Sequence, residues 1–94
     1  MIIRIVKMTF REDSSETFKE FTTSIKDTIK SFEGCLHLDI YRDIQNPNIF
    51  FSYSHWESEN HLNRYRDSEF FKTTWAKTKL WFGAKPEAWS VCSL

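Results

Sequence analysis

The side chains best suited to proton transfer are three histidines, because histidine alone has a usual pKa near neutrality. His37, His55 and His61 are spaced so that no two stand four residues apart, which argues against a metal-binding pair on one helix. His55 and His61 flank a predicted turn, where exposure to solvent is the default. His37 alternates with Asp39 along a predicted strand, and a carboxylate that orients an imidazole makes it a better base. We therefore take His37 as the candidate catalytic histidine.

Other reactive arrangements are missing from the sequence. It contains no G-x-S-x-G elbow, no glycine-rich phosphate loop and no zinc-like spacing of cysteine and histidine. The two cysteines, Cys35 and Cys92, are too few for a disulfide framework and are expected to be free thiols. Hydrolase, kinase and metalloenzyme chemistry are therefore disfavoured, and we predict no metal site.

The composition narrows the choice of partners. The 13 basic residues balance 13 acidic ones, so we expect neither the basic surface that nucleic acids require nor an electrostatic attraction to membranes. No apolar run approaches the roughly 18 residues of a transmembrane helix, and the N-terminus lacks the layout of a signal peptide, which predicts a cytoplasmic protein. The 9 Phe, 4 Trp and 3 Tyr exceed what so small a core can hold, which indicates a ligand pocket or a subunit interface.

The apolar residues alternate with two different periods along the chain. A strand is expected at 2–10, an amphipathic helix at 15–33, paired strands at 35–42 and 49–56, helical segments after Ser58 and from 69 to 81, and a strand at 87–94. Asp67-Ser68 should separate the two later helical segments, with Ser58 and Ser68 as their N-caps and Ser14 or Asp13 as the cap of the first helix. The resulting β-α-β-β-α-β order predicts an α+β, ferredoxin-like fold in a single domain, residues 1–94.

The predicted first strand carries apolar residues on both faces, which indicates that both faces of the sheet are covered. A second copy of the chain is the simplest cover for the face without helices, so we expect a homodimer. Arg4 interrupts one of these faces and needs a partner, which would be either an acidic ligand or a carboxylate of the second strand. Phe71 and Trp75 stand one helical turn apart and could form the floor of a pocket or pack in the core.

A set of short motifs runs through the predicted hairpin and the helical region that follows it. The motifs are Gly34-Cys35-Leu36, Tyr41-Arg42-Asp43, His55-Trp56-Glu57-Ser58, Leu62, Tyr65, Ser68 and Phe70-Phe71. This pattern resembles the antibiotic biosynthesis monooxygenase (ABM) superfamily. The resemblance implies a dimeric α+β barrel with a pocket in each subunit between sheet and helices. It also implies a choice of activities, because some members oxidise quinols or anthrones with molecular oxygen and without metal, flavin or haem, whereas others degrade haem, act on a signalling furanone, or have no known activity.

Two positions depart from the pattern of the family. The histidine that is common in the second helix is replaced by Tyr65, which can hydrogen-bond a phenol or quinone oxygen but is a poor base at neutral pH. The position that resembles the iron-binding histidine of the haem-degrading branch is Trp75, and the first strand has no asparagine. The resemblance therefore implies chemistry without haem, and we expect no cofactor.

These observations predict a cofactor-independent monooxygenase that acts on a quinol or similar small aromatic molecule. Tyr65 and Trp56 would orient the substrate, with the Trp56 indole N–H as a donor, and Arg4 or a histidine would stabilise the substrate anion. Phe71 and Trp75 would line the pocket. Trp56 and Tyr65 could instead only pack the helix against the sheet. The alternatives are a non-catalytic small-molecule-binding or stress-related dimeric barrel, and an isomerase that moves protons on the same scaffold.

Overall fold

The computed structural model describes all 94 residues and contains four strands and three helices. Along the chain these are β1 (Ile2–Thr9), α1 (Ser15–Lys30), β2 (Cys35–Arg42), β3 (Ile49–Trp56), α2 (Glu59–Arg66), α3 (Glu69–Lys79) and β4 (Glu87–Val91). This order confirms the α+β, ferredoxin-like fold. The first helix ends at Lys30 instead of residue 33, the last strand ends at Val91 instead of residue 94, and Phe10 follows β1 only as an isolated bridge to Phe82.

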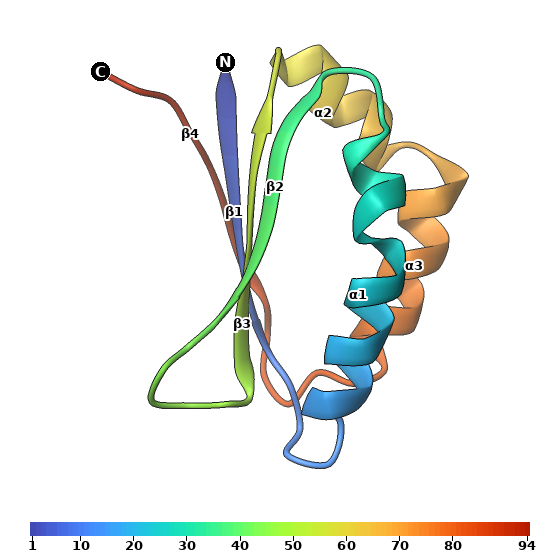
Figure 1. Cartoon of the computed structure of the whole chain (residues 1–94), viewed down its shortest axis with the longest axis vertical. Coiled ribbons are helices and arrows are strands. Elements are labelled where there is room, and N and C mark those ends of the chain that lie inside the picture. The colour runs from blue at the N-terminus through green and yellow to red at the C-terminus, as the bar shows by residue number, and fades with distance from the viewer.

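The four strands form one antiparallel sheet in the order β2-β3-β1-β4. All three helices lie on one face of this sheet, and no other part of the chain covers the opposite face (Figure 1). Because side chains alternate along a strand, Val6 and Met8 of β1 face the helices, whereas Ile5 and Lys7 face away from them. The sheet therefore has an inner face toward the helices and an outer face away from them.

The two later helices begin at serine caps, as the sequence predicts. The Ser58 hydroxyl accepts a hydrogen bond from the His61 backbone N–H at 3.3 Å, and the Ser68 hydroxyl accepts one from the Phe71 backbone N–H at 3.1 Å. These bonds satisfy backbone donors that would otherwise lack a partner at each helix start. Asp67 and Ser68 separate α2 from α3.

The first helix begins without such a cap. Ser14 occupies the N-cap position but makes no side-chain bond to the helix backbone, because its hydroxyl contacts the side chains of Arg11 and Asp13. The helix is instead held by its apolar stripe, in which Phe18 and Ile29 are buried against the sheet. None of the three helices is both long enough and apolar enough to cross a bilayer.

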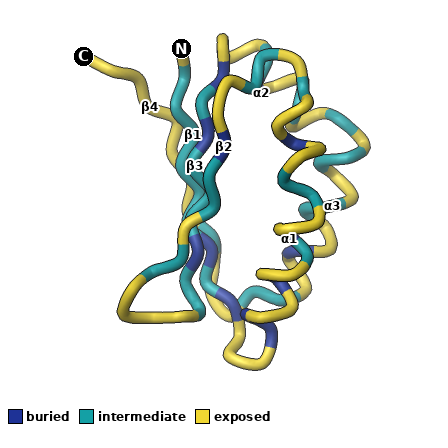
Figure 2. The backbone as a smooth tube through the Cα atoms, viewed as in Figure 1, coloured by how far each residue is buried: buried dark blue, intermediate teal, exposed yellow.

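The dense part of the core lies at one end of the sheet–helix layer. It is a cluster of Met8, Phe10, Phe18 and Phe50, in which the Phe10 and Phe18 rings stack with centroids 4.1 Å apart and Phe50 packs edge-on against both. Only 13 of the 94 residues are buried, and Figure 2 shows how few buried segments lie along the rest of the sheet and helices. A cavity lies between this cluster and the second group of buried residues, Leu38, Trp56 and Leu62, which all line it.

The outer face of the sheet is aromatic and exposed. Trp89 of β4 is 45% exposed and Tyr41 of β2 is 51% exposed, and every residue of β4 is exposed (Figure 2). The expected cover for this face is thus not supplied by the chain itself.

Candidate functional site

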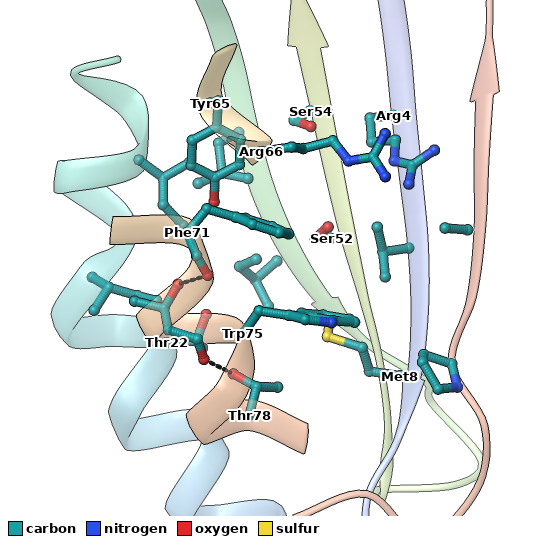
Figure 3. Close-up of a pocket in the computed structure, with 18 of the residues that line it drawn as sticks. Arg4, Met8, Thr22, Ser52, Ser54, Tyr65, Arg66, Phe71, Trp75 and Thr78 are labelled. Carbon is teal, nitrogen blue, oxygen red and sulfur yellow. Dashed lines mark hydrogen bonds between the residues drawn. The ribbon is translucent and has the colours of Figure 1, made fainter. Parts of the chain in front are cut away.

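A cavity of about 260 Å³ lies between the inner face of the sheet and the three helices. Five of the six predicted site residues line it, and they come from four different elements: Arg4 from β1, Trp56 from β3, Tyr65 from α2, and Phe71 and Trp75 from α3. Figure 3 shows the side chains of α2 and α3 reaching across toward the strands. The fold therefore brings together residues that are far apart in the sequence, such as Arg4 and Trp75, which are separated by 71 positions.

The sixth predicted residue, His37, does not belong to this cavity. Leu38 and Ile40 of β2 point into the cavity, so the alternation of the strand turns His37 and Asp39 to the outer face. The expected pair does form, with His37 Nε2 2.7 Å from Asp39 Oδ2, and the Tyr41 hydroxyl donates to the same carboxylate oxygen at 3.0 Å. The prediction that His37 works with the pocket residues is thus corrected, because the sheet itself separates it from them.

Four aromatic rings form a continuous wall of the cavity that runs from the end of β3 along α2 and α3. Trp56 and Tyr65 stack with centroids 4.9 Å apart, Tyr65 meets Phe71 edge-on at 5.2 Å, and Phe71 lies parallel to Trp75 at 5.9 Å. Stacked and edge-on contacts of this kind are favourable arrangements of aromatic pairs. The wall presents ring surface to the cavity and is suited to a planar apolar ligand.

The indole of Trp56 is a structural part of this wall. The side chain is only 1% exposed, and its Nε1–H donates a hydrogen bond to Ser54 Oγ at 3.0 Å. The indole donor is therefore already used within the protein, in contrast to its expected role as a donor to the ligand. The Ser54 hydroxyl accepts this bond and keeps its own proton, which it can donate toward the cavity.

The Tyr65 hydroxyl is the polar group of the wall that remains free. It has no hydrogen-bond partner in the protein, and Figure 3 shows it directed into the space below the ring. Burial raises the pKa of the Tyr65 phenol well above its usual value, with a smaller contribution from the nearby Cys35. Tyr65 is therefore a neutral hydrogen-bond donor at any physiological pH and does not act as a base.

The position of Tyr65 depends on a joint between the start of β2 and the start of α2. Gly34 has a φ of +85°, and a Cβ atom at this position would overlap the imidazole of His61. The backbone N–H of Glu57 donates to the Gly34 carbonyl at 2.8 Å, and the Ser58 hydroxyl lies 2.7 Å from His61 Nδ1. Glycine is required here by both its conformation and the close approach. The Gly34-Cys35 and Trp56-Glu57-Ser58 motifs thus fix the helix that carries Tyr65.

Arg4 does not form an ion pair with a carboxylate of β2, which was one of the two partners expected from the sequence. The strand order places β3 between β1 and β2, so no carboxylate of β2 is within reach. The guanidinium instead donates from Nη1 to the Ser90 hydroxyl of β4 at 3.0 Å. Burial, and secondly the charge of Arg66, lowers the pKa of Arg4, although an arginine remains charged at any pH of interest.

The sequence interpretation missed Arg66. This arginine, the last residue of α2, also lines the cavity, and Figure 3 shows its side chain extending from the helix toward Arg4. Basic residues at the C-terminal end of a helix are common, so its sequence position gave no signal of a role in the cavity. No aspartate, glutamate or histidine lines the cavity, and no group of three or more such side chains or cysteines could hold a metal ion.

Comparison with known proteins agrees with this architecture. The family model described as antibiotic biosynthesis monooxygenase matches residues 1–77. A solved structure of an antibiotic biosynthesis monooxygenase superposes with a TM-score of 0.93 at 13% identity, covering 100% of this chain and 99% of that one. A conserved protein from Methanosarcina mazei Go1 superposes with a TM-score of 0.89 at 22% identity, covering 97% of this chain and 91% of that one. Among curated proteins, none matches the sequence.

Proposed function

The chain belongs to the antibiotic biosynthesis monooxygenase family, and we propose that its cavity oxygenates a small phenol or quinol without a cofactor. In the overall reaction, a phenol with a free ring C–H takes up one O2. One oxygen atom becomes a new carbonyl on that ring carbon, giving a quinone. The other oxygen atom leaves as water with the phenolic proton and the ring hydrogen.

The observation that carries this proposal is the aromatic wall with the unpartnered Tyr65 hydroxyl in it. A planar phenol that lies against Trp75 and Phe71 would place its oxygen within the reach of that hydroxyl and of Ser54. The volume of about 260 Å³ falls just below the roughly 300–1,000 Å³ of pockets for drug-sized ligands. It therefore favours substrates of one or two rings over polycyclic ones.

In this reaction the substrate anion reacts with O2 directly, and the protein only has to stabilise the anionic species. The substrate anion transfers one electron to O2, the resulting radical pair combines to a peroxide on the ring carbon, and cleavage of the O–O bond releases the second oxygen as water. The neutral Tyr65 hydroxyl and the free proton of Ser54 stabilise the phenolate oxygen by hydrogen bonds. The positive charge of Arg4 lowers the energy of every anionic species, and the apolar wall excludes water from them.

The cavity contains no carboxylate or imidazole that could remove the phenolic proton. The substrate must therefore bind as its anion or lose its proton to solvent, with the arginine charge lowering its pKa. The same observation argues against the isomerase alternative, because proton shuttling requires a group that accepts and returns a proton. It is compatible with the second alternative, a protein that binds planar aromatic molecules without turning them over.

The proposal includes a homodimer in which a second copy covers the outer face of the sheet. Trp89, Tyr41 and Val91 are each more than 40% exposed on this face or at its edge. Large exposed aromatic and aliphatic groups on one face are typical of an interface. A two-fold arrangement would also bring the His37–Asp39 pair of each copy into the interface region.

The test compares 1-naphthol with 1-methoxynaphthalene, which has nearly the same shape but no ionisable proton. If the protein is an oxygenase, both compounds should raise its melting temperature, but only 1-naphthol, and not 1-methoxynaphthalene, should support oxygen consumption. A binding protein shows both melting shifts and no oxygen uptake above the uncatalysed background. Failure of both compounds to raise the melting temperature would contradict the assignment of the cavity as an aromatic site.

A further inference from the structure

We propose that Arg4 and Arg66 form an anion-binding end of the cavity, and that the natural ligand is an aromatic molecule with a fixed carboxylate or sulfonate group. This inference deepens the proposed function, because it concerns the substrate class of the same cavity. The anionic substituent is distinct from the reacting phenol oxygen. It would occupy the space between the two guanidinium groups.

The two arginines approach each other from opposite layers of the protein. Arg4 extends from β1 in the sheet and is held by the Ser90 hydroxyl at 3.0 Å, whereas Arg66 extends from the end of α2. Figure 3 shows the two guanidinium groups side by side at the strand side of the cavity, beyond Ser54. Arg66 is exposed and Arg4 is half-buried, which places the pair at the mouth of the cavity.

These two arginines differ from the other three in the chain. Arg11, Arg42 and Arg64 each lie within 4 Å of a carboxylate, from Asp13, Glu16 and Glu33 respectively. Arg4 and Arg66 have no carboxylate partner, and no acidic side chain is among the residues that line the cavity. The unpaired arginines of the chain are thus the two that face the cavity.

Bringing two guanidinium groups together without a counter-ion is unfavourable, and the charge of Arg66 contributes to the lowered pKa of Arg4. The end of α2 offers Arg66 its own backbone carbonyls as acceptors. Its side chain makes no such bond and extends toward Arg4 instead. An anion between the two would relieve the repulsion and accept charge-assisted hydrogen bonds from the N–H groups of both guanidinium groups.

The placement of the pair separates the two ends of a bound ligand. The arginines stand at the mouth, and the Tyr65 hydroxyl points into the interior beside Phe71. A ligand whose carboxylate lies between the arginines would extend its ring along the aromatic wall toward that hydroxyl. Arg4 and Arg66 are therefore specificity residues, and the oxygen chemistry takes place at the other end of the ring.

The test uses two ligands that cannot be oxygenated under the assay conditions, 2-naphthoate and its neutral analogue 2-naphthamide. We expect the wild-type protein to bind 2-naphthoate about tenfold or more tightly than 2-naphthamide in calorimetric titration at low salt. Arg66→Gln should remove most of this preference and leave the affinity for 2-naphthamide unchanged. Arg64→Gln is the matched control, because it removes the same charge from the same helix outside the cavity and should preserve the preference.

The exposed position of Arg66 adds a second readout, because the preference should shrink as salt is raised to about 0.5 M. Equal affinity for the two ligands, binding of neither, or a loss of preference in Arg64→Gln as large as in Arg66→Gln would overturn the inference. The comparison of ligands on the wild-type protein needs no variant to fold. If the preference for 2-naphthoate holds but no aromatic acid supports oxygen uptake, the anion site stands and the proposed oxygenation fails. If neutral phenols are oxygenated and the protein shows no preference for acids, the proposed oxygenation stands and the anion site fails.

Discussion

The indole N–H of Trp56 donates to the hydroxyl of Ser54 at 3.0 Å inside the layer between sheet and helices. Both residues belong to β3 and stand two positions apart, so the strand itself brings donor and acceptor to the same face. Trp56 in turn stacks on Tyr65 of α2. This hydrogen bond therefore fixes the indole on which the proposed donor to the substrate stacks.

Removing the Ser54 hydroxyl leaves the buried indole N–H without an acceptor. We expect Ser54→Ala to lower the free energy of unfolding by about 1–3 kcal/mol, the cost of an unsatisfied buried donor. The matched control is Ser52→Ala, because Ser52 lines the same cavity from the same strand and has no hydrogen-bond partner. Urea denaturation would show whether Ser52→Ala stays within about 0.5 kcal/mol of wild type. Equal losses in the two variants would contradict the structural role of the bond.

Removing the Tyr65 hydroxyl should separate function from stability. The hydroxyl has no partner in the protein, so Tyr65→Phe keeps the stacking on Trp56 and is expected to leave the melting temperature unchanged or slightly raised. The rate of oxygen uptake with 1-naphthol should fall about tenfold or more, because a donor to the developing anion is lost. Tyr53→Phe on the outer face should leave the rate unchanged. A large loss of stability with an unchanged rate would place Tyr65 in packing alone.

Adding a methyl group at Gly34 should weaken the joint that sets α2. Gly34→Ala forces a non-glycine residue to a φ of +85° and into the imidazole of His61, which we expect to cost about 1–3 kcal/mol of unfolding free energy. Part of this cost is steric overlap and part is backbone strain. In a His61→Gly background the steric part should vanish, because the new methyl group would overlap the Cβ of His61 as well as its ring, so a double-mutant cycle would report a coupling between the two positions. Additive effects would show that the two residues do not meet.

The pH dependence of oxygen uptake should follow the substrate and not the protein. No carboxylate or imidazole lines the cavity, and burial raises the pKa of Tyr65 so that its phenol stays protonated at physiological pH. For a phenol that binds as its anion, kcat/KM should fall as the pH drops below the pKa of the substrate. For two naphthols with different phenol pKa values, the pH at which kcat/KM begins to fall should therefore differ by the difference between those two pKa values. If kcat/KM fell at the same pH for both naphthols, a group of the protein would be titrating instead.

The outer face of the sheet should mediate self-association. We expect the wild-type protein to sediment as a dimer at micromolar concentration and Trp89→Asp to sediment as a monomer, because a charge on that face would have to be buried. Leu80→Asp is the control, since Leu80 is 69% exposed but follows α3, away from the sheet. A monomeric wild-type protein, or a Trp89→Asp variant that remains dimeric, would contradict the proposed interface.

The sequence was most informative where side-chain period and capping chemistry act locally. The strands, the helices and the break at Asp67-Ser68 follow from alternation, from the apolar stripe and from Ser58 and Ser68 as caps. Element ends were less predictable. The first helix stops at Lys30, because the turn to Gly34 forms a few residues earlier than the apolar pattern ends.

The site was predictable in its aromatic part and not in its charged part. Phe71 and Trp75 were identified from their spacing of one helical turn, and Trp56 and Tyr65 from the motifs of the resemblance, and all four line the cavity. His37 was chosen for its neighbour Asp39, but both lie on the polar face of β2, and the apolar face of that strand is the one that lines the cavity. The pairing of Arg4 with β2 was excluded only by the order of strands in the sheet, and that order is a long-range property that no local pattern encodes.

The fate of oxygen during turnover of a small quinol by the metal-stripped protein decides whether the cavity is the site of a monooxygenation. Monooxygenation consumes one O2 for each substrate and forms water, whereas uncatalysed oxidation of a quinol forms hydrogen peroxide, from which catalase returns half of the oxygen. We expect protein-dependent uptake in an oxygen electrode that catalase does not reverse and that Tyr65→Phe largely abolishes. Uptake no faster than without protein, or a return of half the oxygen on addition of catalase, would show that the protein is not a monooxygenase of quinols.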